Sequence, residues 1–242
     1  MSSDSNLPNG FARRAGSLFC EDAQASHLAE QFGTPLYIYS QSAITEAFLT
    51  WKQAFGDARH LVCYAVKANS NIAILRLLAS LGSGFDIVSG GELERVLTAG
   101  GDAAKVVFSG VGKSPAEIRR ALEVGIRCFN VESSSELYLI EKIASERGEI
   151  ARISIRINPD VDAKTHPYIS TGLKENKFGV NAQQALELYR YAQGASHLQP
   201  VGVDCHIGSQ LTEVAPFVES VQHLRDLVLQ LRKSGINIEH ID

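Results

Sequence analysis

Short hydrophobic runs recur along this chain, each bounded by turn residues and followed by a segment with helical spacing of its apolar positions. Runs of this kind, alternating with helices, are typical of parallel strands that are buried on both faces of a sheet. The pattern therefore predicts an α/β protein with seven parallel strands. These strands are expected at residues 61–66, 85–88, 106–108, 128–131, 153–157, 201–206 and 236–241.

Three serines mark the expected beginnings of helices. Ser89, Ser114 and Ser133 each precede a glutamate by three positions. In this capping-box pattern the serine and the glutamate side chains accept hydrogen bonds from backbone N–H groups that the first helical turn leaves free. The chain is thus expected to continue from a strand into a helix at each of these points.

Strands that alternate with helices can build an open doubly wound sheet or a (β/α)8 barrel. A glycine-rich Gly-x-Gly-x-x-Gly turn after the first strand would favour a doubly wound, dinucleotide-binding sheet, and the chain has none there. The prediction is therefore a TIM-type (β/α)8 barrel. Since only seven strands are found, we expect a barrel that stops within or after strand 7.

The N-terminal segment has a different pattern. Residues 18–20 and 36–39 are predicted strands, with a helical segment at 24–32 between them. An isolated pair of strands is only marginally stable in water, so these strands are expected to join a β-domain that this chain does not contain. The expected division is an N-terminal segment at 1–42 and an incomplete barrel at 43–242.

Composition limits the classes of function. The 242 residues are 45% hydrophobic and 21% charged, which suits a globular protein with a full core. A net charge of −4, without any block of Lys or Arg, argues against nucleic-acid and membrane partners, and neither a secretory signal nor an apolar run of membrane-spanning length is recognised. The four cysteines lack metal-binding spacing, so free thiols, no metal and a cytoplasmic location are expected.

The first predicted barrel strand ends in a lysine, Lys67. A buried ammonium is costly to keep charged, so a lysine at the end of a core strand has a partner, a chemical task, or a stem that covers apolar surface while its head reaches water. Functional groups of (β/α) barrels lie at the carboxyl ends of the strands. Asp86, Arg156 and His206 are predicted to lie at that same edge.

Three motifs and an insertion stand out along the predicted barrel. They are YAVKANSN at 64–71, FDIVSGGELERVL at 85–97, HIGSQ at 206–210 and the insertion at 158–179. Taken in order, they resemble the fold-type III pyridoxal-phosphate-dependent decarboxylases. The two earlier motifs are shared with the ornithine and arginine branches, whereas the insertion, through its THPYISTG and KFG segments, is similar to the branch that acts on diaminopimelate.

The resemblance implies a role for each candidate residue. It implies that Lys67 forms a Schiff base with pyridoxal 5'-phosphate, that His206 stacks on the cofactor ring and that Ser209 helps to hold the phosphate. Asp86 would lie near the lysine, and Arg156 would support the cofactor side of the site. Ordinary alternatives remain open, namely a strand histidine, a turn serine and structural ion pairs.

A long segment after the fifth predicted strand, 158–179, has the length of a functional loop. Its mixture of charges suits the covering of a zwitterionic substrate. We expect it to act as a lid over the active site, with His166, Thr171 and Lys177 facing the substrate. The alternative is a solvated surface loop.

The implied activity is that of a carboxy-lyase. Members of the branch convert meso-2,6-diaminopimelate to L-lysine and carbon dioxide as homodimers, so a small amino-acid substrate is expected. Family members also carry a glycine-rich loop, a Glu-Pro-Gly-Arg segment and a β-domain beyond strand 7, and for that reason these 242 residues alone are expected to be poorly stable and inactive. Three alternatives stay open: another basic amino-acid decarboxylase, a non-catalytic pyridoxal-phosphate-binding barrel, and a cofactor-free barrel such as an isomerase.

Overall fold

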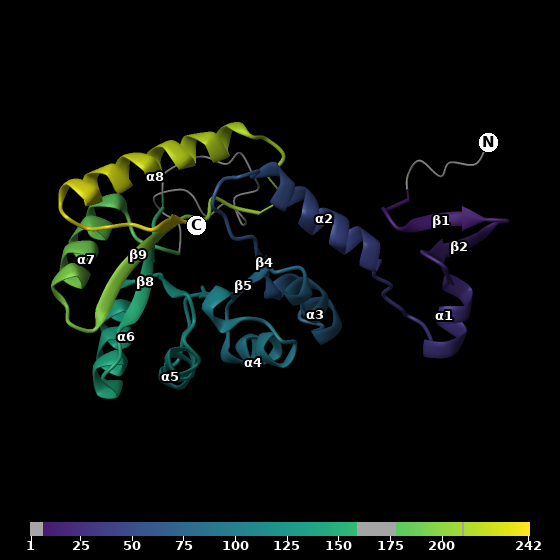
Figure 1. Cartoon of the computed structure of the whole chain (residues 1–242), viewed down its shortest axis with the longest axis horizontal. Coiled ribbons are helices and arrows are strands. Elements are labelled where there is room, and N and C mark those ends of the chain that lie inside the picture. Colours follow the sequence, from purple (N-terminus) through teal and green to yellow (C-terminus); the bar gives the residue numbers. More distant parts are fainter. Residues whose placement is uncertain (1–6, 159–177, 210) are drawn as a thin grey trace.

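The computed structural model describes residues 7–158, 178–209 and 211–242. Within these ranges a curled sheet of seven parallel strands forms the centre of the molecule (Figure 1). Buried apolar residues, many of them β-branched, dominate the strands, as is typical of parallel strands that helices cover. The strands are β4 (Cys63–Ala65), β5 (Gly84–Ile87), β6 (Val106–Phe108), β7 (Cys128–Val131), β8 (Ala151–Arg156), β9 (Leu198–Asp204) and β10 (His240–Ile241).

The order of the strands decides between the two predicted topologies. Each strand pairs with the strand that precedes it in the chain, from β4 at one edge to β10 at the other. A doubly wound sheet reverses its strand order at a switch point, and the described strands show no such reversal. The prediction of a truncated (β/α) barrel is confirmed. The first and last strands are shorter than predicted, because residues 61–62 and 236–239 lie outside the regular pairing.

Helices cover the outer side of the curled sheet (Figure 1). Helix α4 packs on β5, α6 on β7 and β8, and α7 on β8 and β9. Two short 3-10 turns also occur, η2 (Val66–Ala68) directly after β4 and η3 (Ala103–Lys105) before β6. The helices are α2 (Gln41–Ala54), α3 (Ile72–Ser80), α4 (Gly90–Thr98), α5 (Pro115–Val124), α6 (Ser134–Arg147), α7 (Ala182–Gly194) and α8 (Ala215–Lys233).

Side chains of the strands divide between two faces of the sheet. On the outer face, large side chains such as Phe85, Phe108 and Phe129 are buried in the main core together with residues of the helices. On the opposite, concave face, Val107 and Cys128 form a small separate apolar cluster with Val201 and the half-buried Cys63. Side chains alternate between the two faces along a strand, so every second residue lies on this concave face. Further along the strands, toward their carboxyl ends, the residues on this face are polar.

Serine caps begin three of the helices as predicted. Ser89, Ser114 and Ser133 each accept a hydrogen bond from the backbone N–H of the glutamate three residues later. The reciprocal capping box forms at Ser114, whose N–H donates to the Glu117 carboxylate. At the other two helices the glutamate side chain accepts instead from the residue before the serine, so it secures the end of the preceding strand as well as the helix.

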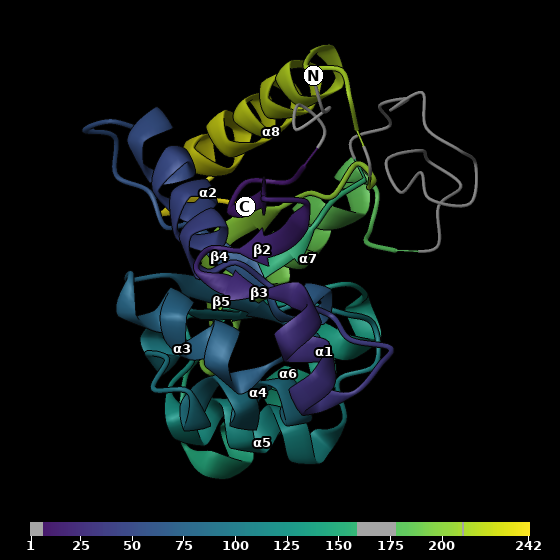
Figure 2. The ribbon, with the colours of Figure 1, turned by 90° about the vertical axis from the view of Figure 1, so that its right-hand side faces the viewer.

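The N-terminal segment forms a small antiparallel sheet of its own, in the order β1-β2-β3 (Figure 2). Its elements are β1 (Phe11–Arg14), β2 (Ser17–Cys20), β3 (Ala23–Gln24) and helix α1 (Ala25–Phe32). The predicted strand at 18–20 and the helix at 24–32 are confirmed. Residues 36–39 form no strand within the described ranges, although exposed and half-buried positions alternate there; their pairing in a further β-domain stays a prediction.

A hydrogen-bonded contact joins this small sheet to helix α2. The Glu21 carboxylate accepts from the Ser40 hydroxyl at 2.8 Å and from the Ser42 backbone N–H at 2.7 Å, and the Ser40 hydroxyl in turn caps α2. These hydrogen bonds lower the pKa of Glu21, the one from the Ser42 N–H most. Gly10 packs so closely that an added Cβ atom would lie 2.0 Å from the Ser40 hydroxyl. The start of α2 is therefore held by the N-terminal sheet.

Candidate active site

Lys67 lies immediately past the carboxyl end of β4. The chain leaves the strand at Ala65 and tightens into η2, in which Val66 is fully buried and Lys67 is exposed. The expectation of a buried ammonium is therefore corrected, because the neighbouring valine takes the core position. An exposed amine at the mouth of the concave face is accessible to a ligand and free of the desolvation cost of a core lysine.

Asp86 lies on the concave face of β5, between the buried Phe85 and Ile87 of the outer face. The Ser109 hydroxyl donates a hydrogen bond of 2.6 Å to its carboxylate. Burial raises the pKa of Asp86 to about 6, while the Ser109 hydrogen bond and the charge of Lys67 oppose this shift. The Asp86 carboxyl therefore changes its protonation state close to neutral pH.

Arg156 ends β8 and forms an ion pair with Glu132, which follows β7. The guanidinium lies 2.8 Å from the carboxylate, with side-chain exposures of 12% and 2%. The ring of Phe178 lies 5.5 Å from the guanidinium carbon, so the side chain is held on two sides. The structural ion pair considered for this arginine is present.

His206 and Ser209 follow β9, which ends at Asp204. Partial burial, and then the positive charges of Arg156 and Lys67, lower the pKa of His206. Ser209 is exposed in a turn directly after Gly208, whose φ of +139° favours glycine. The electrostatic interactions link His206 to Lys67 and Arg156, and Lys67 to Asp86, at one end of the sheet.

Three predicted residues of the lid, His166, Thr171 and Lys177, lie outside the described residues. The chain is described again from Phe178, and Gly179 has a φ of +73°. A Cβ atom on Gly179 would lie 2.9 Å from the Arg156 carbonyl oxygen. The glycine of the KFG segment is thus required where the chain returns to β8.

Sequence reasoning missed a hydrogen-bonded chain across the concave face. The Asn130 side-chain amide donates to the Ser109 hydroxyl at 3.1 Å and to the Asp242 carboxylate at 3.0 Å. Ser109 donates onward to Asp86, so side chains from four neighbouring or facing elements are joined. The signal was present, since Cys128, Asn130 and Glu132 alternate and must share the concave face.

Asp204, at the end of β9, is a further buried carboxyl of this region. Burial, and next the charge of Asp242, raise the pKa of Asp204 well above its ordinary range, while Arg156 opposes the shift. The concave face therefore combines an accessible amine, an imidazole, an ion-paired guanidinium and carboxyls whose pKa values are raised. The amine can condense with a carbonyl carbon, the guanidinium can hold an anionic ligand, and the titratable groups can exchange protons with that ligand.

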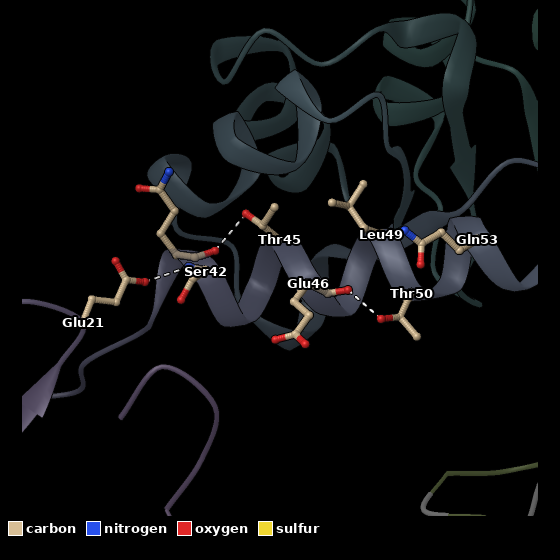
Figure 3. A pocket seen from close by; sticks show the side chains of 8 residues that line it. Glu21, Ser42, Thr45, Glu46, Leu49, Thr50 and Gln53 are labelled. Carbon is tan, nitrogen blue, oxygen red and sulfur yellow. Dashed lines mark hydrogen bonds between the residues drawn. The ribbon is translucent and has the colours of Figure 1, made fainter. Parts of the chain in front are cut away.

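A groove of about 600 Å³ lies elsewhere, along helix α2 (Figure 3). None of its lining residues is a predicted site residue. Its polar groups bond within the groove: Thr45 and Thr50 donate to backbone carbonyls one turn earlier, and Glu21 accepts from Ser42. We assign the chemistry to the strand ends, where the titratable groups act on one another, rather than to this groove.

Fold and site together define a (β/α)-barrel protein that presents an amine at the carboxyl ends of its strands. Residues 41–242 match the family described as "Pyridoxal-dependent decarboxylase, pyridoxal binding domain". This match covers most of the chain, and the chain belongs to that family.

Several characterised proteins are similar to this chain. The diaminopimelate decarboxylase of Neisseria meningitidis serogroup A is 60% identical over 226 residues, which make up 93% of this chain and 56% of that protein. The crystal structure of diaminopimelate decarboxylase from Helicobacter pylori complexed with L-lysine has 51% identity and a TM-score of 0.88, covering 90% of this chain and 55% of that one. The enzyme from M. jannaschi has 43% identity and a TM-score of 0.89, covering 97% and 56%. The chain spans about half the length of these relatives.

Proposed function

We propose that this chain is the pyridoxal-phosphate-binding part of a diaminopimelate decarboxylase, which converts meso-2,6-diaminopimelate to L-lysine and carbon dioxide. One observation carries the proposal: Lys67 is exposed directly after the first barrel strand, and its charge acts on both Asp86 and His206. The substrate follows from the relatives of 51–60% identity, which are named diaminopimelate decarboxylases.

The described residues fit this cofactor. The amine of Lys67 suits the cofactor aldehyde, the imidazole of His206 suits its ring, and Ser209 with the turn at Gly208 suits its phosphate. The buried Arg156 Nε has no hydrogen-bond partner in the described part of the chain, so a donor remains for a bound anion or a water molecule. When bound, pyridoxal phosphate supplies the electron sink for the bond that is broken.

The protein residues would then position the reacting groups and control protons. Lys67 would hold or deliver a proton at the substrate α-carbon. The positive charge of Lys67 favours the deprotonated form of Asp86, since opposite charges stabilise each other. His206 would restrict the ring to one face, and orientation of this kind separates decarboxylation from other reactions of the same cofactor.

The first test is covalent capture of the cofactor. Borohydride reduction of the chain incubated with pyridoxal phosphate should attach the cofactor to the peptide that contains Lys67, as read by mass spectrometry. Lys67→Ala should abolish this attachment, while Lys52→Ala, a change on the exposed part of α2, should leave it intact. Attachment that persists in Lys67→Ala would refute the assignment.

The second test measures carbon dioxide release from meso-diaminopimelate, ornithine and arginine. It is run on this chain and on a fusion that adds the C-terminal part of the Neisseria meningitidis relative. Release from meso-diaminopimelate alone by the fusion supports the proposal, and release from ornithine or arginine points to another branch. Capture of the cofactor without release of carbon dioxide would favour a non-catalytic pyridoxal-phosphate-binding barrel. Failure to capture the cofactor would favour a cofactor-free barrel.

Assembly and location are part of the same proposal. We place the enzyme in the cytoplasm as a homodimer, with residues 1–42 contributing strands to a β-domain and 43–242 forming the cofactor-binding barrel. The N-terminal sheet lies at one end of the molecule, beyond helix α2 (Figure 1). No helix within the described ranges is long and apolar enough to cross a membrane. Light scattering coupled to gel filtration of the fusion would test the dimer.

A further inference from the structure

Lys113 is a buried lysine that the proposed chemistry does not use. It lies between β6 and α5, and its side chain has 0% exposure. Its three N–H donors bond to the Gly110 carbonyl at 2.7 Å, the Asn130 carbonyl at 2.8 Å and the Glu136 carboxylate at 2.7 Å. The ammonium therefore fills its whole donor capacity and joins the loop after β6 to the end of β7 and the start of α6.

Glu136 continues the connection toward the site. Its second carboxylate oxygen accepts from the Glu132 backbone N–H at 3.0 Å. The Glu132 side chain accepts from the Gly110 backbone N–H at 3.2 Å and from Arg156 at 2.8 Å, both at one oxygen. Gly110 is thus bonded to Lys113 through its carbonyl and to Glu132 through its N–H.

The connection is specific in its geometry. Gly110 has a φ of +92°, which favours glycine and turns its two polar groups toward different partners. The other oxygen of Glu132 is buried without a hydrogen-bond partner among the described residues. The Glu132 carboxylate is therefore held at one oxygen only, by Gly110 and Arg156. Gly110 is held in turn by Lys113, so Lys113 influences the orientation of this carboxylate.

We propose that Lys113, with Glu136, is a positioning residue that fixes Glu132 and through it the guanidinium of Arg156 at the mouth of the concave face. The proposal rests on the proposed function in one respect, the role of Arg156 toward the cofactor. Supporting residues behind a ligand-binding side chain typically change affinity by 10–100-fold when they are lost, as known best for metal sites. We therefore expect an approximately tenfold weaker affinity for pyridoxal phosphate without the Lys113–Glu136 pair.

The test removes the pair as a unit. Lys113→Met with Glu136→Gln takes away one positive and one negative charge, so the net charge is unchanged and no buried ion is left without its partner. The exposed pair formed by Arg120 and Glu94, at 2.7 Å, provides the matched control as Arg120→Met with Glu94→Gln. Glu136→Gln alone is the milder variant, for use if the double variant does not fold.

The decisive measurement needs no cofactor. The pKa of His206 is read by NMR titration of its imidazole, since Arg156 and Lys67 lower it while Glu132 and Asp242 raise it. Arg156→Gln should raise the pKa of His206, because a positive charge is removed. If the pair positions Arg156, the Lys113→Met, Glu136→Gln variant should show part of that rise. Glu132→Gln changes the pKa of His206 by itself, because the Glu132 charge raises that pKa. When Glu132→Gln is the reference, adding the double variant should leave the pKa of His206 unchanged, because the connecting carboxylate is already lost.

The outcomes separate the two proposals. A raised pKa of His206 together with weaker cofactor binding supports both, and a raised pKa in a protein that never binds pyridoxal phosphate supports the positioning role while refuting the proposed function. An unchanged pKa of His206, in a variant whose unfolding free energy is reduced, would overturn the positioning role and leave Lys113 as a structural residue. A rise that persists in the Glu132→Gln background would overturn it as well.

Discussion

Asp86→Asn should make the protein more stable at neutral and alkaline pH while harming the site. The pKa of Asp86 is about 6 in the folded protein against an ordinary value of 3.8, so the folded state holds a proton that the unfolded chain releases between these values. Stability from this group is therefore complete below about pH 4 and is lost as the pH rises through about 6. A shift of two pKa units corresponds to about 3 kcal/mol.

Asparagine removes this loss because it stays neutral and still accepts the hydrogen bond from Ser109. The advantage of Asp86→Asn over the wild type should thus grow by up to about 3 kcal/mol between pH 4 and pH 7. Urea unfolding at a series of pH values measures it, with the exposed Asp57→Asn as the control that should show no such growth. A difference that is constant with pH, or that favours the wild type more as pH rises, would refute the reasoning.

Three further substitutions test local hydrogen bonds and backbone conformation in the fold. Tyr189→Phe should cost about 1–3 kcal/mol, because the buried hydroxyl bonds to backbone groups of β8 and β9, and the exposed Tyr191→Phe should cost less. Gly179→Ala should cost about 1–3 kcal/mol through its positive φ, against about zero for Gly112→Ala in open space. Ser40→Ala should cost about 1–2 kcal/mol by removing the cap of α2. Chemical denaturation checks each value, and equal costs within a glycine or tyrosine pair would contradict these reasons.

The architecture could be predicted because its elements are specified locally. Apolar runs gave the strands and serine caps gave the helix beginnings, both of which depend on residues within a few positions. The segment 36–39 could not be decided in this way, since its alternation is that of a strand while none of the described strands pairs with it. The strands β1 and β3 were missed because they are short, and β1 is mostly exposed.

The site was predicted only in part, and for a physical reason. Lys67 and His206 are conspicuous in the sequence because they follow strands, whereas Lys113 and Glu136 act through carbonyl oxygens and an N–H group that any residue could supply. A partner of this kind is set by distances between loops, which a sequence pattern does not contain. Glu132 is intermediate, because strand alternation could have placed it on the concave face.

The sequential order of the strands also bears on how this molecule forms. Every strand from β5 to β10 adds to an edge that the preceding strand has already made, so the sheet can grow as the ribosome delivers it. Contacts between strands that follow one another in the sequence close short loops, which favours rapid folding of the sheet. The bonds of His240 to Cys128 and of Asp242 to Asn130 each span 112 positions, so they form only after β10 has joined the sheet. The hydrogen-bonded chain across the concave face, which includes Asp242, is therefore complete only once β10 is in place.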